Sequence, residues 1–124
     1  MHNAKLMSFV STTNPDKART FYRDVLGLTL ITEEPIALVF DAAGVMLRVS
    51  VVKELTPQPF TVLGWQVPDI RTSLNELKAK GVIFEQYGFP GQDADGIWTT
   101  LDGTRVAWFK DPDSNLLSLT QFPE

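Results

Sequence analysis

Apolar residues recur at helical spacing in two stretches, one at about 15–26 and one in the second half of the chain. Asn14 precedes the first stretch and Gly27 follows it, while Asp69 precedes the second and Gly81 follows it. Asn and Asp side chains accept N–H groups at a helix N-terminus, and Gly adopts the positive φ of a helix C-terminus. The pattern therefore predicts two helices in equivalent places.

β-Branched and aromatic residues fill most of the remaining chain, as is typical of strands. Turn residues separate these segments, and Asp102-Gly103 is a strong hairpin signal. The first half of the chain is thus predicted to contain a strand, a helix and three further strands. The second half repeats this order, with a strand, a helix and three or four further strands. The two halves meet at a stiff connector, Thr56–Pro59. We therefore predict one domain over residues 1–124, made of two modules at about 1–55 and 56–124. The expected strands are 5–13, 28–32, 36–41, 45–53, 60–67, 82–86, 97–101, 104–110 and 116–122.

Composition removes several kinds of chemistry. The 124 residues include no Cys and one His, His2, which excludes thiolate sites and most His-based catalysis. A net charge of −4 disfavours binding to nucleic acid, which needs clustered positive charge. No apolar run is long enough for a membrane span or a signal peptide, so we expect a cytoplasmic protein without membrane partners.

Two segments resemble the vicinal oxygen chelate superfamily, which includes glyoxalase I, bleomycin- and fosfomycin-resistance proteins and extradiol dioxygenases. Residues 14–28, with Phe-Tyr followed by Leu-Gly, resemble its first-helix signature, and residues 106–119, with Asp-Pro-Asp-Ser-Asn, resemble its C-terminal signature. Ser114 stands where the family usually has Gly. The resemblance implies an α+β fold of two paired β-α-β-β-β modules. Their mixed sheets would form an open cup, with helices on the convex face and the ligand in the concave face. The resemblance also implies a homodimer.

Metal-dependent members hold a divalent ion at four inward-facing strand positions occupied by His, Glu or Gln. By resemblance, these positions fall at Met7, at or beside Arg48, at Leu63 and at Ser118. A thioether is too soft for such an ion, Leu has no donor atom and Arg repels a cation. A shift of one residue brings no better donors. We therefore expect no metal and no cofactor.

Strand alternation gives the set of inward-facing side chains. Arg48 either binds an anionic ligand, lies on the surface of its strand, or pairs with an acid such as Asp102 or Asp95. The tryptophans either stack on a flat ligand or fill the core and a dimer interface. The expected ligand-binding residues are Met7, Phe9, Met46, Arg48, Leu63, Trp65, Trp98, Trp108 and Ser118.

Three other features have mainly structural interpretations. Tyr22 belongs to the helix stripe that packs on the sheet. Asp111, Asp113 and Asn115 have the spacing of a turn in which side chains cap the backbone. The polar loop 92–96 is either a lip over the cup or an ordinary surface connection.

The favoured function is therefore a metal-free small-molecule-binding protein that holds an aromatic or anionic ligand. The alternative is a glyoxalase-like lyase, isomerase or dioxygenase-related enzyme in which Arg48 stabilises an enolate. That enzyme would need a base, and only Glu33, Glu34 or Asp95 at the rim would be available. A third hypothesis is a partner-binding module whose cup is closed by side chains.

Overall fold

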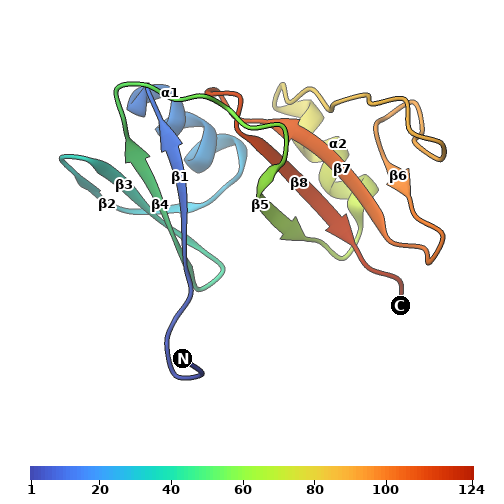
Figure 1. The fold of residues 1–124 in the computed structure, drawn as a ribbon, viewed down its shortest axis with the longest axis horizontal. Coiled ribbons are helices and arrows are strands. Elements are labelled where there is room, and N and C mark those ends of the chain that lie inside the picture. Colours follow the sequence, from blue (N-terminus) through green and yellow to red (C-terminus); the bar gives the residue numbers. More distant parts are fainter. The chain divides into compact units, whose positions relative to one another are not determined.

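The computed structural model describes residues 1–124, which form two compact units. The first comprises Met1–Pro57 with Asp111–Asn115, and the second comprises Gln58–Lys110 with Leu116–Glu124. Figure 1 shows the elements along the chain. Those of the first unit are β1 (Met7–Thr12), α1 (Pro15–Thr20), η1 (Phe21–Val25), β2 (Thr29–Glu34), β3 (Ala37–Ala42) and β4 (Val45–Val51). Those of the second are β5 (Thr61–Gln66), α2 (Ile70–Ala79), β6 (Trp98–Thr99), β7 (Arg105–Lys110) and β8 (Leu116–Gln121).

Each unit contains one open, four-stranded mixed sheet. The strand orders are β1-β4-β3-β2 and β5-β8-β7-β6, with β1–β4 and β5–β8 parallel and the other pairs antiparallel. The two orders are equivalent, because each unit follows β-α-β-β-β along the chain. The α+β fold of two repeated modules is thereby confirmed.

The core of the first unit lies on the face of its sheet that carries Leu47 and Val49, both fully buried. Phe40 pairs in register with Leu47, and its ring centroid lies 5.9 Å from that of Tyr22 in η1. Tyr22 is therefore part of the packed core, as the helical stripe predicted. The second unit is built in the same way: its fully buried core residues are Ile70, Leu74, Ile97, Ala107, Phe109 and Leu117.

The helix ends follow the sequence signals. Asn14 Oδ1 accepts from Lys17 N at 3.2 Å, and Asp69 Oδ1 accepts from Thr72 N at 3.1 Å. The first helix departs from expectation after Thr20, where it widens into the π-helical turn η1. This wider turn allows two adjacent aromatic residues, Phe21 and Tyr22, to be buried together.

The expected strand at residues 82–86 is wrong. Phe84 forms a single bridge with Phe109, and Glu85 N donates to Trp108 O, but no further pairing follows. The carbonyl of Glu85 instead accepts from the side-chain amide of Gln92, whose Oε1 accepts from the backbone of Tyr87. A side chain thus satisfies the groups that strand pairing would use.

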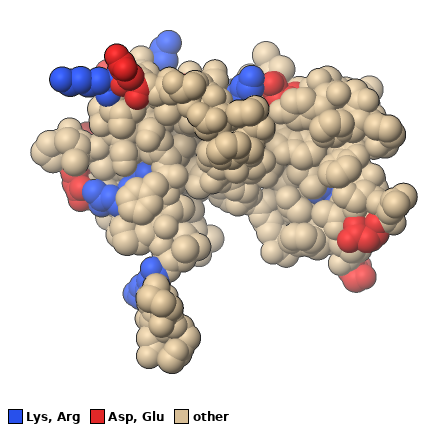
Figure 2. Space-filling model, viewed as in Figure 1, with Lys and Arg blue, Asp and Glu red and all other residues tan.

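The surface shows few charges on the face drawn in Figure 2, where uncharged atoms cover most of the area. No helix of the chain has the length and apolar character needed to cross a membrane.

Candidate functional site

The first-unit sheet has one face that no helix covers. Register places Met7 beside Met46 and Phe9 beside Arg48, and paired residues point to the same side of a sheet. These four side chains therefore share the face opposite Leu47. This is the orientation that strand alternation predicted. Phe9 is 57% exposed, so a large apolar side chain faces solvent here.

A pocket of about 360 Å³ opens on this face. Met7 and Met46 line it together with Val39, which follows the same alternation on β3. Lys5 and Asp41 add charged groups to a lining that is otherwise mostly apolar. The complete lining is Lys5, Leu6, Met7, Ile31, Val39, Phe40, Asp41, Gly44 and Met46. We call this the sheet-A pocket.

Arg48 does not line the sheet-A pocket, but it is the register partner of the lining residue Val39, and its side chain pairs with Glu34. Its Nη2 atom lies 2.5 Å from Glu34 Oε1. The acids that sequence reasoning named, Asp95 and Asp102, are engaged elsewhere: Asp95 bonds to Arg71, and Asp102 to Thr100. The hydrogen bond from Arg48 lowers the pKa of Glu34, so the pair is ionised at neutral pH. Nε and Nη1 of Arg48 make no hydrogen bond within the chain.

The second unit carries a cluster of four aromatic rings, which we call the aromatic cluster: Tyr87, Phe89, Trp98 and Trp108. The indole centroids of Trp98 and Trp108 lie 5.9 Å apart, and Phe89 contacts both indoles edge-on. Both indole N–H groups are satisfied internally, Trp98 by Pro90 O and Trp108 by Thr61 Oγ1. The rings therefore pack mainly on one another.

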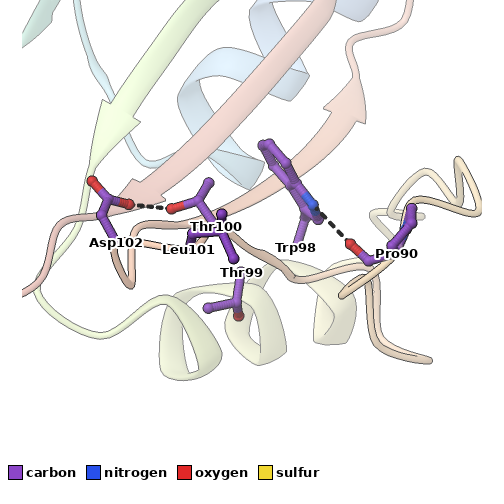
Figure 3. A pocket seen from close by; sticks show the side chains of 6 residues that line it. All are labelled: Pro90, Trp98, Thr99, Thr100, Leu101 and Asp102. Carbon is purple, nitrogen blue, oxygen red and sulfur yellow. Dashed lines mark hydrogen bonds between the residues drawn. The ribbon is translucent and has the colours of Figure 1, made fainter.

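Trp98 also lines a second-unit pocket of about 600 Å³ with Pro90 and the segment 99–102. Figure 3 shows the Trp98 indole reaching toward Pro90, while Thr99 points the other way. This alternation is that of a strand, although β6 is only two residues long.

Leu63 and Trp65 do not face the side that alternation predicted. Register pairs Leu63 with Leu117 and Trp65 with Leu119, whose partners on β7 are the core residues Phe109 and Ala107. Ser118 pairs instead with Gly64. The count of six residues back from Asp69, which selected Leu63, is therefore out of step with Ser118 by one residue; the register irregularity between Thr61 and Leu63 lies before these residues.

The Asp111–Asn115 turn is a structural feature that the sequence predicted correctly. Asp111 Oδ1 accepts from the backbone N–H groups of Asp113 and Asn115, each at 2.9 Å. Asp113 bonds in turn to Thr12 Oγ1 and to the backbone N–H of Thr13. The side chains therefore cap backbone groups and fix the turn to the end of β1.

A buried hydrogen bond behind this turn was missed by sequence reasoning. The Tyr22 hydroxyl donates to Asp111 Oδ2 at 2.7 Å, and both residues are buried. Burial raises the pKa of Asp111, although the donors from Asn115 and Tyr22 oppose the shift. Burial also raises the pKa of Tyr22, so its hydroxyl stays protonated as a donor.

The loop at 92–96 is tied to α2. Arg71 forms ion pairs with Asp93 and Asp95, each at 2.7 Å, and Lys78 also contacts Asp95 at 3.1 Å. Burial opposes ionisation of Asp93, but the Arg71 guanidinium and backbone N–H groups outweigh it and lower the pKa of this carboxyl.

The side chains do not fit the metal of the metal-dependent superfamily members. The four positions identified by resemblance hold Met7, Arg48, Leu63 and Ser118, and the register that moves Gly64 beside Ser118 adds no donor. No group of three or more His, Cys, Asp or Glu side chains anywhere in the chain is arranged to hold an ion. A divalent cation of this kind requires several oxygen or nitrogen ligands.

Known proteins share this architecture. The fosfomycin resistance protein FosX from Listeria monocytogenes is 16% identical, with a TM-score of 0.78 over 99% of this chain and 96% of that chain. Lactoylglutathione lyase from Agrobacterium tumefaciens is 16% identical, with a TM-score of 0.73 over 96% and 93%. A glyoxalase/bleomycin resistance protein/dioxygenase from Alicyclobacillus acidocaldarius is 20% identical, with a TM-score of 0.72 over 98% and 93%.

These identities indicate a shared fold and no particular activity. No curated protein matches the chain in sequence. The family model of the Glyoxalase/Bleomycin resistance protein/Dioxygenase superfamily matches residues 6–119, which is nearly the whole chain. The chain therefore belongs to the Glyoxalase/Bleomycin resistance protein/Dioxygenase superfamily.

Proposed function

We propose that this protein binds a small, flat, apolar anion without a metal, on the open face of the first-unit sheet. The observation that carries the proposal is a mostly apolar pocket lined by Met7, Met46 and Val39, with Arg48 outside the lining but in register with Val39 on the same face of the sheet. Small-molecule sites are typically apolar with a few groups that orient the ligand.

The spacing along β4 suits such a ligand. Met46 and Arg48 lie two residues apart on one face, which is roughly 7 Å along a strand. Val39 lines the pocket and is the register partner of Arg48 on the next strand. A fused two-ring anion can therefore lie over Met46 and Val39 with its charged group at Arg48.

Glu34 competes with the ligand for the same cation. Its carboxylate is 40% exposed and binds only Nη2 of Arg48, so an incoming carboxylate can bind Nε and Nη1 or displace it. The pairing keeps the guanidinium neutralised while the pocket holds no ligand. It also lowers the intrinsic affinity for anions.

The same ion pair favours binding over catalysis. An isomerase or lyase acting through Arg48 would need a neighbouring base, and Glu34 is the carboxylate bonded to it. Arg48 lowers the pKa of Glu34, which makes this carboxylate a weaker proton acceptor.

Isothermal titration with 2-naphthoate and its neutral analogue 2-naphthamide tests the proposal. We expect the protein to bind both, and the naphthoate more tightly. Arg48→Gln should weaken naphthoate binding about tenfold and leave naphthamide binding unchanged. Glu34→Gln should strengthen naphthoate binding about threefold, because the competing carboxylate is gone.

Arg23→Gln is the matched control, since Arg23 is an exposed arginine of the same unit that pairs with its neighbour Asp24. It should leave both affinities unchanged. The proposal is contradicted if the protein fails to bind 2-naphthoate or 2-naphthamide. It is also contradicted if Arg48→Gln weakens the binding of both compounds equally.

A further inference from the structure

Two of the three methionines in the chain are neighbours in the sheet-A pocket. Met7 on β1 is the register partner of Met46 on β4, and both side chains point to the open face. They are 43% and 40% exposed, so dissolved reagents can reach them. Two adjacent, accessible thioethers thus form part of the wall that an apolar ligand would contact.

Thioethers react with peroxides in a defined way. The sulfur lone pair attacks one oxygen of hydrogen peroxide, the O–O bond breaks, and the second oxygen leaves as water after proton transfer. The sulfur is oxidised to a sulfoxide and the peroxide is reduced to water. The product is polar and chiral, and methionine sulfoxide reductases convert it back to the thioether.

We propose that Met7 and Met46 form a reversible oxidation site, at which hydrogen peroxide converts the thioethers to sulfoxides and the sheet-A pocket then rejects apolar ligands. The effect on ligands rests on the proposed function. The oxidation itself rests on the exposure and placement of the two side chains alone.

The position of the pair explains why oxidation would alter the pocket and spare the fold. The core of this unit lies on the opposite face, where Leu47 and Val49 are fully buried. The pocket wall beside the methionines includes the apolar side chains of Ile31 and Val39, together with Asp41, the register partner of Met46. A sulfoxide placed there retains bound water, and an apolar ring can no longer cover it without loss of hydrogen bonds.

The test combines peptide mass spectrometry with binding. The protein is treated with increasing hydrogen peroxide, and sulfoxide is quantified separately at Met1, Met7 and Met46. Met1 is fully exposed and serves as the internal reference for a freely accessible thioether. Binding of 2-naphthamide is measured before and after treatment, because this neutral probe does not depend on Arg48.

We expect Met7 and Met46 to oxidise in the same peroxide range as Met1, with an about tenfold loss of naphthamide affinity. Methionine sulfoxide reductases should restore that affinity. The double variant Met7→Leu with Met46→Leu keeps the pocket apolar. Its naphthamide affinity is compared with its own value before treatment, and peroxide should not change that affinity.

The outcomes separate the two proposals. If Met7 and Met46 stay reduced while Met1 oxidises, the oxidation site is refuted whatever the protein binds. If both oxidise and affinity is unchanged, or falls equally in the double Leu variant, the effect on the pocket is refuted. If the untreated protein binds no naphthamide, the proposed function fails and the effect on ligands fails with it.

Discussion

The hydrogen bond from Tyr22 to Asp111 provides a direct test of how the first unit is held together. Tyr22→Phe removes one oxygen from a side chain that is 1% exposed, and it leaves the ring in place. Asp111 then keeps its two backbone donors and the side-chain amide of Asn115, but loses the donor at 2.7 Å. Hydrogen bonds to charged groups contribute about 1.5–3 kcal/mol. We expect the free energy of unfolding to fall by about 2 kcal/mol.

The loss should depend on pH, and its sign follows from the ionisation of Asp111. Burial raises the pKa of Asp111 in the folded protein, so its ionisation costs stability as pH rises through the folded pKa. Tyr22 opposes this cost because its hydroxyl bonds to the ionised form. Without that donor, the cost of ionisation grows. The difference between wild type and variant should therefore be largest at about pH 7 and smaller at about pH 4, nearer the ordinary Asp pKa.

Urea denaturation followed by tryptophan fluorescence measures both quantities. Tyr87→Phe is the matched control, because the Tyr87 hydroxyl makes no hydrogen bond within the chain and the side chain is 42% exposed. It should change stability by less than about 0.5 kcal/mol at either pH. A Tyr22→Phe loss as small as that of the control, or one that grows toward acid, would refute the reasoning.

Three further predictions concern the turn, the loop and metal binding. Ser114→Gly should stabilise the protein by about 0.5 kcal/mol in urea unfolding, because Ser114 has a φ of 67°, which strains any residue except Gly. The greater freedom of Gly in the unfolded chain offsets part of this gain. A destabilised variant would contradict this prediction. Arg71→Gln should speed amide hydrogen exchange in residues 91–96 while barely moving the urea midpoint, since its ion pairs with Asp93 and Asp95 are well exposed; unchanged exchange would show that other contacts hold the loop. After equilibration with Ni, Zn, Mn or Fe and desalting, elemental analysis should find no stoichiometric metal; one ion per chain would overturn the assignment of the four positions.

Local signals were sufficient for most of the fold. Caps at Asn14 and Asp69 and the repeated order of elements follow from short-range rules that the structure obeys. The prediction of a strand at 82–86 is wrong because the side-chain amide of Gln92 donates to the Glu85 carbonyl, which strand pairing would otherwise use. The apolar content of the segment gives no sign of this contact.

The candidate site was harder to predict because it depends on register. Met7, Phe9, Met46 and Arg48 share a face since β1 and β4 pair without interruption. Leu63 and Trp65 are predicted on the wrong face because the count back from Asp69 is out of step by one residue, and a shift of one residue moves a strand side chain to the opposite face. The partner of Arg48 was missed for a similar reason: Glu34 lies 14 residues away on the edge strand, and only the strand order β4-β3-β2 brings them together.

The Asp111–Asn115 turn also bears on how the protein is made. It belongs to the first unit, yet the hydrogen bond between Thr12 and Asp113 joins residues 101 positions apart. The amino-terminal module therefore emerges from the ribosome long before the segment that completes it. A fragment ending at Pro57 lacks the acceptor for Tyr22 and the carboxylate that fixes Thr13, so we expect the repeated halves to fail as autonomous folding units when separated.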